Sequence, residues 1–242
     1  MVAIVVGKEG SGRRVVFLLA ASLILGAVTS TLLVSTAHAN HDCPSDNQIR
    51  AKPGTNGRGT RVGGSDPGMR VSNTDIDCVR VSSIGVINSS STTFAEIGWY
   101  EDPMGLSDCP ATSGQPRILV YRKFNGVPMC QTQPVISGPF PRNDEFIVND
   151  SDQNGVWRYF RNGSFLGSFD LGSFITGEGR ANSERKSGHH DSMYALFLGL
   201  DRMNSSQGWT NWANTTQLEN SDAEYHLCGL PGDDLEMKIG TC

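Results

Sequence analysis

The sequence predicts an all-β fold, an antiparallel β-sandwich or barrel stabilised by disulfides. Three observations lead to this fold class. From residue 79 onward, short runs of β-forming residues are separated by turn signals, and no stretch after residue 40 sustains a helical period over three turns. The chain also contains 28 glycines and six cysteines. Many short strands joined by Gly- and Asn-rich turns are typical of antiparallel sandwiches and barrels.

Eight segments after residue 90 are expected to form strands. They span residues 92–100, 117–124, 145–148, 156–161, 164–171, 194–200, 223–230 and 235–239. The clearest is 156–161, which alternates with Trp157 and Tyr159 on one side, so Trp157 is expected in the core. Asn162-Gly163 follows directly and predicts a two-residue type I′ hairpin, because that turn needs positive φ at both central positions.

The first 39 residues have the pattern of a secretory signal peptide. Two adjacent arginines precede an apolar segment at 15–34, and Ala-His-Ala at 37–39 fits a signal-peptidase site. The apolar segment could also span a bilayer, so an uncleaved anchor is the alternative. Residues 40–242 are then expected to form one secreted domain, in which 40–80, rich in Gly, Asn, Asp, Ser and Arg, is an irregular N-terminal segment.

Charge argues against two classes of partner. The whole chain has a formal net charge of −5, and removal of residues 1–39 leaves 17 basic against 24 acidic residues. Nucleic-acid binding needs a basic surface, and so does binding to an anionic membrane. We therefore expect neither partner for the mature domain.

All six cysteines lie after the proposed cleavage site. They are Cys43, Cys78, Cys109, Cys130, Cys228 and Cys242. An even number of cysteines in an exported chain predicts disulfides, here three. Six cysteines allow 15 connectivities. Chain order suggests that neighbours pair, as Cys43–Cys78, Cys109–Cys130 and Cys228–Cys242.

One acidic segment raises the question of calcium. Asp150, Asp152 and Asn154 stand at alternate positions before Gly155, the spacing with which a calcium loop presents oxygen ligands. The twelfth position of such a loop, where a bidentate Glu belongs, is Arg161. Without that Glu, a polar turn between two strands is the alternative interpretation, and no other cofactor is indicated.

Two tryptophans are candidates for ligand binding. Trp209 and Trp212 lie in a stretch rich in Gly, Asn and Thr, which favours a loop or a strand edge. Flat aromatic rings that are exposed stack on the apolar C–H faces of sugars. The alternative is core packing, because most tryptophans are largely buried.

Two glutamates are candidates for a catalytic pair. Glu178 lies between Gly177 and Gly179, where the backbone can approach a ligand closely, and Glu96 lies in an expected strand next to Gly98. A glycosidase or a glutamic peptidase needs two carboxyl groups facing each other, one protonated and one ionised. Surface charge is the alternative for each of them.

The sequence also resembles known proteins. A resemblance to a family of secreted, actinobacterial-type proteins extends from Phe94 to Ile239 and is carried by the stretches VWRYFRNGSFLGSFDLG, GEGRANSERK, YALFLGL, GWTNW and EYHLC. The aromatic strand before Asn-Gly is similar to strands of concanavalin-like jelly rolls. Gly98-Trp99 and the glycine-flanked Glu178 are distantly similar to neprosin-like glutamic peptidases, which are also jelly rolls.

These resemblances imply a jelly-roll sandwich and leave two functions open. The first is a binding module for a glycan or another cell-surface polymer, with Trp209 and Trp212 at the site. The second is an acid-active glutamic peptidase with Glu178 and Glu96, as the distant resemblance implies. The second function requires that the two carboxyl groups share one groove.

Overall fold

The structure is a computed structural model. It describes residues 47–53, 55–71, 79–103, 108–112, 115–136, 139–186, 194–212, 215–220, 225–229 and 234–239. The internal contacts of the chain define two compact units, Met1–Asn40 and His41–Cys242, and every described residue belongs to the second. The proposed signal peptide therefore lies outside the described residues. Within them the secondary structure is all strand, and no helix is long and apolar enough to cross a membrane.

Three antiparallel sheets contain all the described strands. The largest, sheet A, has the order β17 (Thr216–Asn220), β1 (Asn47–Lys52), β13 (Gly177–Lys186), β5 (Val79–Ile87), β6 (Phe94–Glu101), β7 (Arg117–Phe124) and β8 (Val127–Val135), with β2 (Asn56–Gly57) also pairing with β13. Sheet B has the order β12 (Ser164–Asp170), β11 (Val156–Arg161), β10 (Phe146–Asn149), β3 (Gly59–Val62), β15 (Leu200–Met203) and β16 (Trp209–Asn211). Sheet C has the order β18 (Tyr225–Gly229), β19 (Leu235–Ile239), β14 (Tyr194–Phe197), β4 (Met69–Val71) and β9 (Arg142–Asp144).

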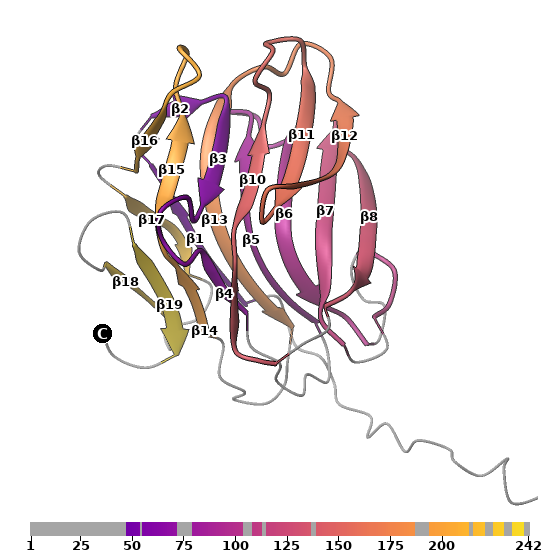
Figure 1. Cartoon of the computed structure of the whole chain (residues 1–242). Helices are drawn as coiled ribbons and strands as arrows, with labels where there is room; N and C mark the ends of the chain where they lie inside the picture. The colour runs from indigo at the N-terminus through magenta and orange to yellow at the C-terminus, as the bar shows by residue number, and fades with distance from the viewer. Residues whose placement is uncertain are drawn as a thin grey trace, which may run out of the picture. The chain divides into compact units, whose positions relative to one another are not determined.

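Sheets A and B pack face to face, which confirms the expected sandwich. β10 contacts β5 and β6, β3 contacts β5, and β12 contacts β7, and these strands form the two facing layers of Figure 1. Between the layers, Ile97 and Val120 from sheet A and Phe146 and Trp157 from sheet B are completely buried in one core. Burying aromatic and branched aliphatic side chains between two sheets is the main source of stability in this architecture. The core position predicted for Trp157 is confirmed.

The Asn-Gly signal marks two hairpins. Asn162 and Gly163 have φ angles of 47° and 73° between β11 and β12, as predicted. Asn125 and Gly126, with φ angles of 50° and 84°, join β7 to β8 in the same way. The Asn162 amide is also held from both ends: its Oδ1 accepts the backbone N–H of Glu145 at 2.7 Å, and its Nδ2 donates to Asp144 at 2.7 Å.

The prediction of an irregular segment at 40–80 is wrong for much of its length. β1, β2, β3 and β4 all lie between residues 47 and 71, and each of them pairs with a strand from later in the chain. β1 and β3 are central strands of sheets A and B. Their sequences are polar or glycine-rich, so hydrophobic alternation does not reveal them, and the long-range pairing supplies their order.

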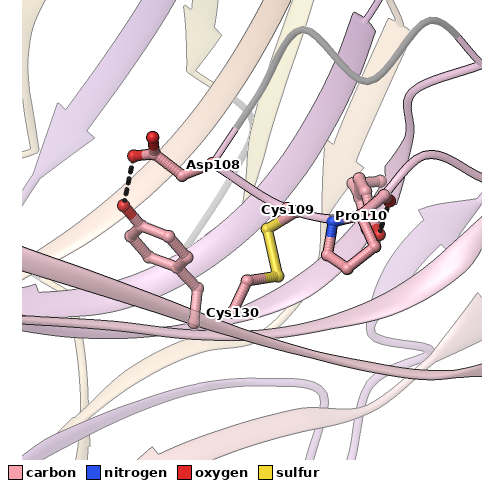
Figure 2. Close-up of a disulfide and its surroundings, with 6 residues drawn as sticks. Asp108, Cys109, Pro110 and Cys130 are labelled. Atoms are coloured by element: carbon pink, nitrogen blue, oxygen red, sulfur yellow. Dashed lines mark hydrogen bonds between the residues drawn. A yellow bond between two sulfur atoms is a disulfide. The ribbon is translucent and has the colours of Figure 1, made fainter.

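One of the expected disulfides is fully described. Cys109 and Cys130 are bonded, with 5.2 Å between their Cα atoms (Figure 2). Cys228 is also disulfide-bonded, and none of the described cysteines is free. Cys43, Cys78 and Cys242 lie outside the described residues, so the pairings expected for them stay predictions.

Candidate ligand-binding site

The outer face of sheet A carries an unusual row of side chains. In register across four strands, Arg180 of β13 lies opposite Gly85 of β5, Gly85 opposite Glu96 of β6, and Glu96 opposite Tyr121 of β7. Successive residues of a strand point to opposite faces. The residues that alternate with this row, such as Ala181, are fully buried in the core against sheet B. The row itself therefore faces away from the core.

Two further rows flank this central one. On one side lie Glu178, Ile87, Phe94 and Lys123, and on the other side lie Asn182, Ser83 and Gly98. The face thus combines two acids, two cations, an amide and aromatic rings within three rows of a rigid sheet. None of these side chains is needed to fill the core, so their chemistry is available for binding.

A cleft opens in the middle of this face. Its volume is about 300 Å³, and its lining includes Gly85, Phe94, Glu96, Arg180 and Asn182. Gly85 leaves the position between Arg180 and Glu96 without a side chain. A Cβ at Gly85 would stand 2.8 Å from the Ala95 carbonyl oxygen, so only glycine fits here. The cleft is therefore a gap in the row of side chains, with the β5 backbone as its floor.

Asn182 supplies an unsatisfied acceptor to this cleft. Its side chain is 9% exposed, and its Oδ1 accepts no hydrogen bond within the described part of the chain. Leaving a buried acceptor unpaired costs about 1–3 kcal/mol, so such groups are rare in folded proteins. Because Asn182 lines the cleft, a ligand bound there would lie next to this unpaired acceptor.

The charged groups of the face are partly paired with one another. Glu178 pairs with two cations. Its Oε1 lies 2.7 Å from Lys52 Nζ, and its Oε2 lies 2.7 Å from a guanidinium nitrogen of Arg180. Glu96 accepts the hydroxyl of Ser83. Lys123 lies at the cleft rim. The face therefore has a carboxylate at Glu96, two positions along β6 from Phe94, and a cation at Lys123, opposite Phe94 on β7.

Aromatic rings border the cleft on the β7 side. The ring of Phe94 lies 5.3 Å from that of Tyr121, and both are half-buried. The Tyr121 hydroxyl donates to Asp108 Oδ2 at 3.0 Å. Burial, followed by this hydrogen bond and the charge of Asp108, raises the pKa of Tyr121 above its ordinary value, so the hydroxyl stays protonated and donates a hydrogen bond to Asp108.

The two glutamates proposed as a catalytic pair share this face but are not neighbours in it. Glu178 and Glu96 are separated by β5 and by two positions along the strands, which corresponds to about 12 Å between their backbones. Only Glu96 lines the cleft. Both oxygens of Glu178 are engaged by Lys52 and Arg180, which leaves neither to hold the proton of a general acid.

The two tryptophans proposed as a binding surface occupy different environments. Trp212 is 3% exposed and belongs to the core cluster, so its assignment as a surface residue is wrong. Trp209 is partly exposed in β16, and the Arg61 guanidinium lies 4.8 Å from its ring centre. Arg61 in turn pairs with Asp201 at 2.6 Å. One face of Trp209 is therefore already covered, and the two rings form no common platform.

The segment proposed for calcium is the turn between β10 and β11. Asp150 is completely buried, and its carboxylate accepts the backbone N–H groups of Asn154 and Gly155 at 3.2 and 2.9 Å. Asp152 pairs with Arg158, and Asn154 Oδ1 accepts the N–H of Val156. The described residues contain no group of three His, Cys, Asp or Glu that could hold a metal ion. These contacts close a turn between strands, and calcium at this place stays a prediction.

Comparisons with known proteins concern the fold. No protein-family model and no curated protein sequence matches the chain. Similar solved structures include a carbohydrate-binding module from Bacillus subtilis (TM-score 0.38, 6% identity, covering 58% of this chain and 79% of that one). They also include β-agarase A from Zobellia galactanivorans (0.37, 7%, 80% and 72%) and a β-glucanase from Bacillus licheniformis (0.31, 8%, 84% and 69%).

The class of protein is an antiparallel β-sandwich with a disulfide on its outer face. Similarities at this level transfer no activity. The resemblance to secreted actinobacterial-type proteins stays a prediction, because nothing in these comparisons tests it.

Sequence reasoning missed most residues of the cleft. Arg180 and Asn182 lie on β13, where polar outward residues alternate with small inward residues over 177–184, so this part of the strand lacks hydrophobic alternation. A period-2 alternation of charged or amide side chains with Gly, Ala and Ser was the available signal. Gly85 was equally detectable, as an isolated glycine inside an apolar strand, which suggests close approach of another group.

Proposed function

We propose that this protein is a secreted carbohydrate-binding domain whose ligand occupies the cleft on the outer face of sheet A. One observation carries the proposal: Asn182, whose buried Oδ1 has no hydrogen-bond donor among the described residues, lines a cleft that Gly85 leaves open between a guanidinium and a carboxylate. Such a site demands a ligand that donates a hydrogen bond and carries several other polar groups close together.

The chemistry of a sugar ring matches this arrangement. Its hydroxyls both donate and accept, so one ring can donate to Asn182 and Glu96 while it accepts from Arg180. Hydrogen bonds to charged groups are the stronger kind. The apolar C–H face of the same ring can lie against Phe94 at the cleft wall. Ligand sites commonly combine a few placed polar groups with an aromatic surface.

A binding experiment tests the proposal directly. The mature protein is applied to a glycan array with neutral and acidic chains, and hits are measured by isothermal titration calorimetry. Asn182→Ala should weaken binding about tenfold, since one hydrogen bond to a buried acceptor is lost. Asn143→Ala, an exposed amide on β9 of sheet C, is the matched control and should leave the Kd unchanged. Absence of any hit, or a folded Asn182→Ala variant that binds normally, would refute the proposal.

Secretion is part of the same proposal. The signal pattern of residues 1–39 and the disulfides of the domain both support export. When the full chain is expressed in a secreting host, N-terminal sequencing of protein from the medium should begin at Asn40. Protein that begins at Met1 and sediments with membranes would show that residues 15–34 serve as an anchor.

A second candidate function is hydrolysis by the acidic pair. The observation that favours it is that Glu96 and Glu178 lie on the same face of one sheet. Casein incubated at about pH 4, within the carboxyl titration range, would reveal a glutamic peptidase. Cleavage that disappears in both Glu96→Gln and Glu178→Gln would establish it, and cleavage that survives either substitution would exclude the pair.

A further inference from the structure

The central row of the binding face continues beyond the cleft. Tyr121 of β7 lies opposite Glu96 on one side and Cys130 of β8 on the other. The side chain of Cys130 therefore points to the same outer face as the cleft. Its disulfide to Cys109 brings residues 108–110 onto that face, at the end of the row (Figure 2).

This segment is tied down at three consecutive residues. Asp108 accepts the hydroxyl of Tyr121 at 3.0 Å, Cys109 is bonded to Cys130, and the carbonyl of Pro110 accepts the hydroxyl of Tyr100 at 2.6 Å. Figure 2 shows both hydrogen bonds flanking the disulfide. We refer to residues 108–110 as the stapled segment. Because it is covalently anchored, it forms a fixed wall at the β8 side of the binding face.

The stapled segment fixes the orientation of Tyr121. The ring is held at its hydroxyl by Asp108 and at its side by Phe94, with 34° between the two ring planes. Both rings remain partly exposed, so together they form a shallow aromatic surface next to the cleft. A fixed ring loses little conformational entropy when a ligand stacks on it, which makes it an effective contact.

Phe94 lines the cleft, but Tyr121 lies farther from its floor than the width of one sugar ring. Gly85 and Tyr121 lie two strands apart, which corresponds to about 10 Å. A monosaccharide in the cleft cannot reach across this distance, whereas the next unit of a chain that runs across the strands can. The stapled segment then bounds the far end of the binding face, beside β8.

We infer that the protein binds an oligosaccharide chain that runs across the strands, with one unit in the cleft against Phe94 and the next stacked on Tyr121. This inference rests on the proposed function and specifies its ligand class. Tyr121 is the contact residue of the second subsite, and Asp108 is its positioning residue. The stapled segment holds that subsite in place.

Chain-length dependence tests the inference. Glucose chains with β-1,3 or β-1,4 links and galacturonate chains, each of one to four units, are titrated by calorimetry alongside the array. For the series that binds, two units should bind at least about tenfold more tightly than one, the gain expected of one stacked ring. Equal affinity for one and two units would overturn the inference and leave the proposed function standing. Absence of binding throughout the array and the series would remove both.

Variants assign the gain to Tyr121. Tyr121→Ala should reduce the gain from the second unit to less than about threefold and leave the one-unit Kd unchanged. Phe165→Ala, which removes a 58% exposed ring on β12 of sheet B, is the matched control and should preserve the whole gain. Circular dichroism and melting curves establish that each variant is folded. A folded Tyr121→Ala protein that keeps the full gain would contradict the assignment.

The positioning role of Asp108 has its own readout. If Asp108 acts only through Tyr121, then Asp108→Ala and Tyr121→Phe should weaken two-unit binding equally, and the double variant should be no weaker than either. In addition, Asp108→Ala should lower the pH at which Tyr121 ionises, followed by ultraviolet absorbance against the Tyr121→Phe protein. Independent, multiplying losses or an unchanged titration would show that Asp108 does not act through Tyr121.

Discussion

Removing the Cys109–Cys130 disulfide should destabilise the domain by a predictable amount. The two cysteines are separated by 21 residues in the sequence. The entropy lost by closing a loop of this length in the unfolded chain corresponds to about 3.3 kcal/mol at 25 °C. For a domain of roughly 200 residues, each kcal/mol shifts Tm by about 2–4 °C, so the expected fall is about 7–13 °C.

The variant must remove only this disulfide. Reduction would also open the disulfide at Cys228, so the double substitution Cys109→Ala/Cys130→Ala is used under oxidising conditions. The native contacts of the stapled segment persist through the Tyr100–Pro110 hydrogen bond. Urea unfolding should give a lower free energy together with a larger m-value, because the unfolded chain expands. A loss below about 1 kcal/mol with an unchanged m-value would refute the loop-entropy argument.

Three other outcomes follow from the structure. Gly98→Ala should destabilise the domain by at least about 2 kcal/mol in urea unfolding, because its Cβ would clash with the β5 backbone at Ser82, whereas Gly229→Ala meets nothing within 4 Å and serves as the control. Burial raises the pKa of Tyr159, so the contribution of Tyr159 to folding stability should be constant below about pH 10 and fall above it as the unfolded tyrosine ionises. A Tyr159→Phe protein should lose less stability in that range, and an identical alkaline decline in both proteins would contradict this. Asp150→Ala should lower the unfolding free energy by about 1–3 kcal/mol, because two backbone N–H groups lose their acceptor. Its melting temperature is measured with calcium and with chelator, and a calcium-dependent rise in the wild type alone would place the ion at this turn.

The fold was largely predictable because local signals and tertiary packing agree in its central strands. The ranges expected for β7, β11 and β19 match the structure residue for residue. Each has β-forming residues in alternation or in a dense run, and the β11–β12 turn has its Asn-Gly pair. β8 was missed although Asn125-Gly126 precedes it, because Pro128 lowers its strand signal; the strand lies at the edge of sheet A, where a proline is tolerated.

The candidate site was less predictable than the fold. The sequence indicates Glu96 and Glu178 as candidate site residues. The distance between them depends on β5 lying between β6 and β13, which no local pattern reveals. Sequence patterns do not indicate Asn182 and Arg180, because a strand segment in which polar residues alternate with small ones has the composition of a loop. The polar neighbours of Trp212 favour a surface position, whereas its large ring favours burial, and Trp212 belongs to the core cluster.

The two Asn-Gly hairpins also determine how this protein ages chemically. In an Asn-Gly sequence the glycine nitrogen can attack the side-chain amide carbon of asparagine and expel ammonia, which forms a cyclic imide. Water then opens the imide to aspartate or isoaspartate. At the β11–β12 turn the amide of Asn162 is clamped between Glu145 and Asp144, which keeps it from the required geometry. The described residues give the side chain of Asn125 no such clamp, and it is exposed. Of these two hairpins, the β7–β8 turn, which joins the strands that carry Tyr121 and Cys130, should therefore deamidate first.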